Sequence, residues 1–118
     1  MKYALLIYDD PSSWESLHPE EAQKFREQEM PHWETAMGEL ANVDPEFTGY
    51  ELESRSKARV VRVQDGERIV TDGPFVETKE VIGGFFVAEV PDLDEAIRLA
   101  AVIPSAEGGA IEIRPVIG

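Results

Sequence analysis

Asp72 is the residue whose type and setting most directly suggest chemistry. It opens the run Asp72-Gly73-Pro74-Phe75, which falls between two predicted strands. A carboxylate held at the edge of a cleft can act as a general base, or it can orient a histidine. Asp-Gly-Pro is also a turn-forming sequence, because an aspartate side chain bonds to nearby backbone N–H groups. The residue types therefore leave two interpretations of Asp72, one catalytic and one loop-ordering.

The residues after Asp72 form a candidate substrate-binding loop, made of Gly73, Pro74, Phe75, Glu77 and Lys79. Lys79 could bind an anionic group of a substrate. It also has acidic neighbours, so a solvent-exposed ion pair of little energetic value is the simpler interpretation. We expect Phe75 to anchor the loop in the core rather than to stack against a ligand.

The chain has only two histidines, His18 and His32. We expect His18 to be structural, at the start of a helix. His32 falls at the rim of the apolar face of that helix, and Glu29 precedes it by one turn on the same side. A carboxylate placed in this way can orient an imidazole, which makes His32 a candidate catalytic partner of Asp72. The alternative is a partly exposed rim histidine beside Trp33.

Metal, cofactor and thiol chemistry find no support in the residue pattern. There are no cysteines, which excludes a thiolate nucleophile, a disulfide framework and a cysteine-ligated zinc. The two histidines are too far apart on one helix to share an ion. The chain shows no dinucleotide-binding fingerprint and no G-x-S-x-G sequence. We therefore expect neither a metal nor a cofactor.

The net charge of −13, from 24 acidic and 11 basic residues, limits the partners. Nucleic acids and anionic membrane surfaces are repelled, because binding to phosphates needs clustered Lys and Arg. No stretch approaches the roughly 20 apolar residues needed to span a bilayer, and a cytoplasmic location is expected. The acidity mainly indicates solubility, with a specific basic partner as the alternative.

The elements that must position these residues begin with a strand at residues 2–8, apolar on both faces. A helix is predicted from Pro19, which suits the first helical position, to about Ala41. Pro31 interrupts it and predicts a kink or a break. Its expected apolar face consists of Ala22, Phe25, Trp33, Ala36 and Leu40, with Met37 at one edge.

A hairpin is the clearest feature of the middle of the chain. Asp65-Gly66 joins the predicted strands 58–64 and 67–71, and this dipeptide favours a tight turn in which both residues have positive φ. A short strand at residues 50–53 is expected to precede it. The loop 72–80 and a further strand at 84–90, apolar on both faces near its start, follow it.

The last third of the chain predicts a helix and a strand. Asp92 can cap the helix, with Glu95 at the reciprocal capping-box position. Pro104 ends the helix, and a strand at 110–116 follows, with Ile111 and Ile113 facing inward and Glu112 and Arg114 outward. The expected buried stripe of the helix is Leu93, Ala96, Ile97 and Ala100.

The element order β-α-β-β-loop-β-α-β predicts a single α+β domain over residues 1–118, with the ferredoxin-like β-α-β-β-α-β pattern and the hairpin as an extra element. Two helices can cover only one face of such a sheet. Because two strands are apolar on both faces, we expect a second copy of the chain to cover the other face.

The run from Thr71 to Glu80, followed by Gly83-Gly84-Phe85-Phe86, closely resembles the hallmark of the YCII-related, or DGPF-domain, proteins. The first strand, the junction at 90–96 and the strand 112–116 resemble the same family. The resemblance therefore covers nearly the whole chain.

This resemblance implies a homodimeric α/β-barrel in which two ferredoxin-like units pack sheet to sheet. It also places Asp72 at the family's motif aspartate and implies a histidine–aspartate pair as the reactive element. The expected function is a cofactor-free enzyme that carries out acid/base chemistry, an isomerisation or an elimination, on a small organic molecule. A non-catalytic module that binds a small molecule or a protein is the alternative.

Overall fold

An antiparallel sheet of four strands organises the computed structural model, which describes residues 1–76 and 78–118. Its spatial order is β2-β5-β1-β6, and the central strand β1 pairs with both β5 and β6. This α+β arrangement is compatible with the ferredoxin-like fold. The strands are β1 (Lys2–Asp9), β2 (Thr48–Glu51), β5 (Val81–Glu89) and β6 (Ala110–Pro115).

The register of the strands separates the two faces of this sheet. Leu5 pairs with Phe86 on one side and with Ile113 on the other, and all three belong to the core or pack against it. Side chains alternate between faces along a strand, so the neighbouring Leu6 lies on the other face, where it is only half-buried. The predicted strand is thus confirmed, but one chain buries only one of its faces, and burial of the other face stays a prediction.

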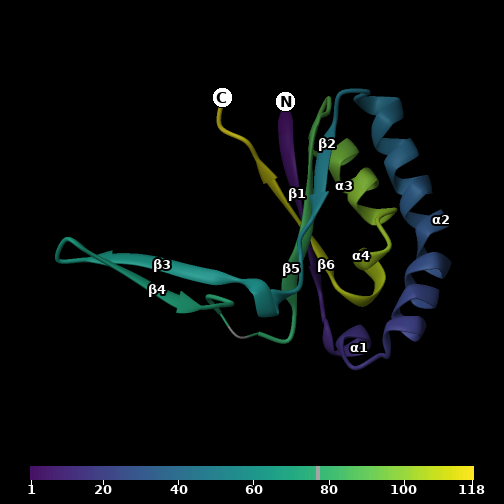
Figure 1. Cartoon of the computed structure of the whole chain (residues 1–118). Coiled ribbons are helices and arrows are strands. Elements are labelled where there is room, and N and C mark those ends of the chain that lie inside the picture. The colour runs from purple at the N-terminus through teal and green to yellow at the C-terminus, as the bar shows by residue number, and fades with distance from the viewer. Residues whose placement is uncertain (77) are drawn as a thin grey trace.

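The helices cover that first face (Figure 1). In the figure, the three helices α2, α3 and α4 lie on one side of the sheet, and α1 lies at the end of β1. The helices are α1 (Ser12–Glu15), α2 (Pro19–Val43), α3 (Leu93–Ala101) and α4 (Ser105–Gly108). The two short helices α1 and α4 were not predicted, because a single turn has too few positions to show a period.

Helix α2 begins at Pro19 as predicted, with His18 as an extended N-cap residue. Of the kink or break predicted at Pro31, the break is wrong, because the helix continues to Val43, and the kink stays a prediction. The predicted apolar face is correct only in the second half of the helix, where Ala36 and Leu40 are buried. Phe25 is exposed, because the first half of α2 does not pack into the core.

Helix α3 is capped as predicted, with the Asp92 carboxylate accepting a hydrogen bond from the backbone N–H of Glu95. The Glu95 carboxylate binds Arg98. The predicted buried stripe needs correction, since Leu93 and Ile97 are half-exposed. The buried side chains are instead Ala96, Leu99, Ala100 and, just past the helix, Ile103. The face of α3 that packs inward is therefore the one that carries Ala96, Leu99 and Ala100.

The strand boundaries moved modestly from their predicted positions. β2 lies two residues earlier than expected, and β5 begins three residues earlier, because Val81 and Ile82 pair with the end of β1 across a bulge. In β6, Ile111 and Ile113 pack against the core as predicted, and Glu112 and Arg114 are exposed.

The hairpin of β3 (Arg59–Gln64) and β4 (Glu67–Asp72) forms a sheet of its own, which we call the arm. A short 3₁₀ turn, η1 (Arg55–Lys57), leads into it. At its tip Asp65 has φ 51° and Gly66 has φ 78°, which confirms the predicted turn. The arm projects away from the side of the sheet that the helices cover (Figure 1).

The arm makes the molecule extended for its length. The radius of gyration is 16.3 Å, whereas a compact domain of this size has about 13 to 14 Å. Among the described residues, no helix is long and apolar enough to cross a membrane.

Candidate functional site

The loop that follows the arm is held closely against the chain that precedes it. Gly73 donates its backbone N–H to the carbonyl of Ala58 at 2.9 Å, and the Gly73–Pro74 peptide bond is cis. A Cβ on Gly73 would lie 2.7 Å from the Cβ of Ala58, so a larger residue would push the two segments apart. Gly73 thus has a clear structural role, and the predicted role in substrate binding stays a prediction.

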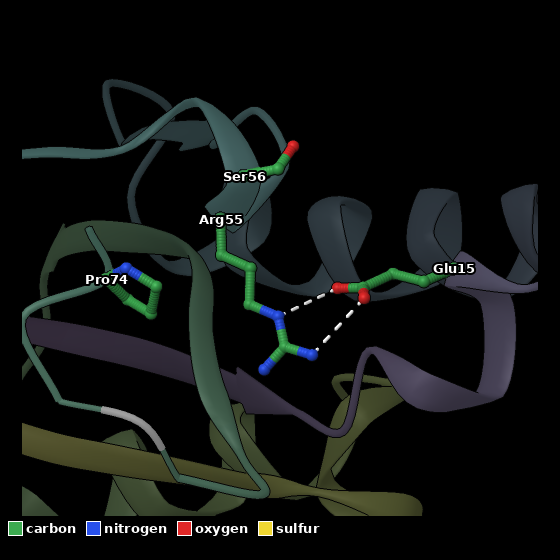
Figure 2. A pocket seen from close by; sticks show the side chains of 4 residues that line it. All are labelled: Glu15, Arg55, Ser56 and Pro74. Carbon is green, nitrogen blue, oxygen red and sulfur yellow. Dashed lines mark hydrogen bonds and ion pairs between the residues drawn. The ribbon is translucent and has the colours of Figure 1, made fainter. Parts of the chain in front are cut away.

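Pro74 borders an open cavity of about 350 Å³ at this end of the sheet (Figure 2). The other residues that line it are Glu15 of α1 and Arg55 and Ser56 of η1. In the figure Arg55 lies in the middle, with Pro74 on one side and Glu15 on the other. The cavity therefore joins the predicted loop to two elements that the sequence did not connect with it.

The Glu15–Arg55 ion pair is the main polar feature of this cavity. The Arg55 guanidinium donates from Nε to Glu15 Oε1 at 2.9 Å and from Nη2 to Oε2 at 3.2 Å, while the third nitrogen points away from Glu15 (Figure 2). Both side chains are only one-third exposed. Such bidentate pairs fix both partners in place. Glu15 thus fixes the Arg55 guanidinium at the cavity, and one of the three guanidinium nitrogens does not bind Glu15.

Two more charged groups belong to the same end of the molecule. The Asp10 carboxylate accepts hydrogen bonds from Ser12, at 2.7 Å from the hydroxyl and 3.0 Å from the backbone N–H. These bonds are the largest reason that the pKa of Asp10 is below its usual range, and the positive charges of Lys79 and Arg55 lower the pKa further. Lys79 and Arg55 thus lie near Asp10, but their effect on its pKa is smaller than that of Ser12.

Asp72 and His32 lie on different parts of the molecule. Asp72 ends β4, with its side chain 89% exposed and its carboxylate 3.4 Å from Nε of Arg59, the residue paired with it across the arm. His32 is an exposed residue of α2. Since α2 and β4 lie on opposite sides of the sheet (Figure 1), one copy of the chain does not bring these two residues together. Their catalytic roles stay predictions.

Phe75 is not the core anchor that we expected. Its side chain is 67% exposed, and its ring lies 4.9 Å from the guanidinium carbon of Arg62 on the arm. A cation–π contact with Arg62 takes the place of burial. Lys79 is exposed, and Glu77 lies outside the described residues. Binding of a substrate by Lys79 and by Glu77 stays a prediction.

Asp10, Glu15 and Arg55 were not predicted from the sequence. Glu15 and Arg55 are 40 residues apart, and neither belongs to a motif. The one local signal was Asp10-Pro11-Ser12, in which an aspartate two residues before a serine commonly bonds to its backbone. Tertiary structure alone assembles the rest of this group.

Comparisons with known proteins agree with the resemblance noted in the sequence. The YCII-related domain matches over residues 1–118. An uncharacterised protein of Rhizobium meliloti (strain 1021) is 32% identical over 117 residues, which cover 98% of this chain and 91% of that protein.

Proposed function

Because the chain belongs to the YCII-related domain family, we propose that it binds a small organic acid at the end of the sheet where the motif loop meets Arg55. The observation that supports this function best is the Arg55 guanidinium, fixed by Glu15 in an open cavity beside Pro74. The planar guanidinium matches a carboxylate in geometry and charge. The acid group of the ligand would accept a hydrogen bond from the Arg55 nitrogen that does not bind Glu15. Alternatively, it would compete with the Glu15 carboxylate for the two nitrogens that do.

Two positive side chains, Arg55 and Lys79, lie at this place, each with a carboxylate nearby, Glu15 and Asp10. A protein with net charge −13 repels anions in general, so an anionic ligand needs local cations. Arg55 and Lys79 both lower the pKa of Asp10, which means that their positive charges act on the same small region. This region is the candidate binding site for the acid group.

Binding is better supported than acid/base catalysis by the groups of the cavity itself. A general base works best when its pKa lies near the working pH. The lowered pKa of Asp10 moves this carboxylate away from that range. Catalysis, the second candidate function, would therefore depend on Asp72 or His32 after a partner has changed their surroundings.

The binding proposal is tested with a panel of small mono- and dicarboxylic acids, with alcohols and amines of the same skeleton as controls. Binding is followed by chemical shifts of the protein and by thermal stabilisation. Arg55→Gln should weaken binding of an acid by roughly tenfold or more, because a charge-assisted hydrogen bond is lost. Arg26→Gln is the matched control, since it removes another arginine–glutamate pair, at Glu51. If both variants bind the acid with equal affinity, Arg55 is not the residue that binds it.

The catalytic alternative is tested on any acid that binds. Conversion of the compound, or exchange of its carbon-bound protons with deuterated solvent, is followed by NMR. Turnover that disappears in Asp72→Asn, with the affinity for the acid unchanged, would assign catalysis to Asp72. Turnover that is unchanged in Asp72→Asn and in His32→Gln would remove both residues from the mechanism.

We also propose that the protein is a homodimer that covers the open face of the sheet. Along this face lie side chains that a single chain leaves half-buried or exposed: Leu6, Tyr50, Ile82, Phe85 and Val87. The accessible surface of 8470 Å² also exceeds the roughly 6,400 Å² of a monomer of this mass. The excess is larger than the roughly 800 Å² that each partner contributes to a standard interface. Sedimentation velocity at micromolar concentration tests this, and a monomer would contradict it.

A further inference from the structure

The Arg55 guanidinium has donor groups that Glu15 does not use. A guanidinium carries five N–H groups, one on Nε and two on each terminal nitrogen. The Glu15 carboxylate accepts from Nε and from Nη2, and the third nitrogen, Nη1, points away from it (Figure 2). We call the side formed by Nη1 and the second N–H of Nη2 the end edge of Arg55. Two parallel N–H groups on one edge are the geometry that binds a carboxylate through both of its oxygens.

A ligand can bind at the end edge without breaking the Glu15–Arg55 ion pair. The fold holds Glu15 beside Arg55, so Glu15 competes for its own two nitrogens at a high effective concentration. A ligand at the end edge avoids that competition. Pro74 lines the same cavity on the side of Arg55 away from Glu15 (Figure 2). The end edge is therefore the favoured position for the acid group.

The carboxylates near the end edge limit the charge of the ligand. Arg55 already has the Glu15 carboxylate as its partner, and Lys79 lies near the Asp10 carboxylate. These two cations and two anions together carry no net charge. A ligand at the end edge would share one guanidinium with Glu15, which repels each negative charge that the ligand brings. A doubly charged group, such as a phosphate monoester, is therefore repelled about twice as strongly as a carboxylate.

We propose that the end edge of Arg55 binds one singly charged carboxylate while Glu15 stays in place, and that Glu15 excludes doubly charged anions. The inference rests on the proposed binding of a small organic acid, and it narrows the ligands to monocarboxylic acids. Phosphate monoesters are the class that the site rejects. Glu15 is then a specificity-determining residue, because it holds the plane of the guanidinium and repels a second negative charge.

The first test compares matched ligands by NMR titration at a pH near 8, where a phosphate monoester carries two negative charges. Phenylacetate and phenyl phosphate form one pair, and butanoate and propyl phosphate form the other. Each carboxylate should bind about tenfold more tightly than its phosphate. If the phosphates bind as tightly as the acids, and Arg55→Gln weakens both, the inference is overturned and acid binding at Arg55 still stands. Affinities that do not depend on Arg55 would overturn both.

The second test removes the charge of Glu15. Glu15→Gln keeps a side-chain oxygen that can accept from Arg55, and it should reduce the preference for phenylacetate over phenyl phosphate by about fivefold. Glu53→Gln is the matched control, because it removes a carboxylate two residues before Arg55 whose partner is Lys57.

Two results of this test would overturn the inference. An equal loss of preference in the two variants would show that net charge alone selects the ligand. A rise of about tenfold or more in the affinity of Glu15→Gln for phenylacetate would show that Glu15 competes with the ligand for the same nitrogens.

The third test uses the wild-type protein and asks whether Glu15 stays on Arg55. The carboxyl ¹³C signal of Glu15, assigned by its absence in Glu15→Gln, is followed while phenylacetate is added. It should keep nearly the same chemical shift at saturation, while the Nη signals of Arg55 move. A Glu15 signal that moves to the position of a solvated glutamate would show that the ligand displaces Glu15. That result would overturn the inference and leave the binding of acids at Arg55 intact.

Discussion

The β1–β5 pair and the β3–β4 pair are both antiparallel, and both are rich in branched apolar residues, yet their surroundings differ completely. Leu5 of β1 is buried under the helices, whereas Val63 of β3 is largely exposed. β1 has a strand on each side and a helical layer above it. Among the described residues, the two strands of the arm pair only with each other. An apolar strand sequence therefore specifies a strand, but not the layer that will cover it.

The two regions also differ in what holds them. The main sheet depends on contacts between residues far apart in the chain, such as Leu5 with Phe86 and Ile113. The arm depends on a local turn and on neighbours within 14 residues, from Arg59 to Asp72. We therefore expect substitutions in the main sheet to act on the whole fold and substitutions in the arm to act locally.

The largest expected effect is in the helix-covered region. Leu99 is completely buried, so Leu99→Ala should lower the free energy of unfolding by about 2 to 5 kcal/mol through lost burial and a cavity. Val63→Ala in dilute, monomeric protein should change it by only about 0.5 kcal/mol. Urea denaturation measures both. Similar losses for the two variants would show that the arm belongs to the same cooperative unit.

A second contrast uses two glycines of the helix-covered region. A Cβ on Gly49 would overlap with the ring of Phe86, so Gly49→Ala should destabilise the fold by about 1 to 3 kcal/mol. Gly38 of α2 faces open space, and Gly38→Ala should stabilise the fold by about 0.5 to 1 kcal/mol. The melting temperatures of the two variants show whether each substitution stabilises or destabilises the fold. A stable Gly49→Ala protein would mean that β2 is held less tightly than its register indicates.

A substitution in the turn of the arm tests whether the arm responds independently of the main sheet. Gly66 has φ 78°, which an alanine adopts at a cost of about 1 to 2 kcal/mol. In Gly66→Ala, amide hydrogen exchange should quicken in β3 and β4 and stay unchanged in β1. The global unfolding midpoint should move little. Faster exchange throughout both sheets would contradict the separation of the two regions.

The smallest expected effect concerns the charged end of the sheet. The pKa of Asp10 is lowered in the folded protein, first by its bonds to Ser12. Its carboxylate therefore stabilises the fold above its unfolded pKa, and this contribution is lost as the pH falls through the folded pKa. NMR titration should place the Asp10 midpoint below the ordinary value of about 3.9. Ser12→Ala should raise that midpoint; an unchanged midpoint would contradict the assignment to Ser12.

Much of the fold could be predicted because its signals are local. Asp65-Gly66 specified the turn of the arm, Asp92 specified the start of α3, and an apolar run specified the strand β1. The errors concerned packing. Phe25, Leu93 and Ile97 are apolar residues at helical spacing, but the second half of α2 and a different face of α3 meet the sheet.

The candidate site was less predictable than the fold. The motif loop could be located, and Pro74 does border the cavity. The group that faces Pro74 across the cavity is a glutamate–arginine pair from two distant segments, and neither residue has a neighbour that marks it. Phe75 has an aromatic side chain that suits a core, yet the Arg62 guanidinium on the arm holds it at the surface.

By itself the sequence determined the order of the elements, the family and the position of the motif loop, because these depend on neighbouring residues and on short periods. Only the tertiary structure decided that Glu15 and Arg55 meet beside Pro74, that the valines of the arm are exposed, and that Asp72 and His32 lie apart. The physical reason is that charge pairing and burial depend on which distant segments the sheet brings together. A local pattern does not contain that information.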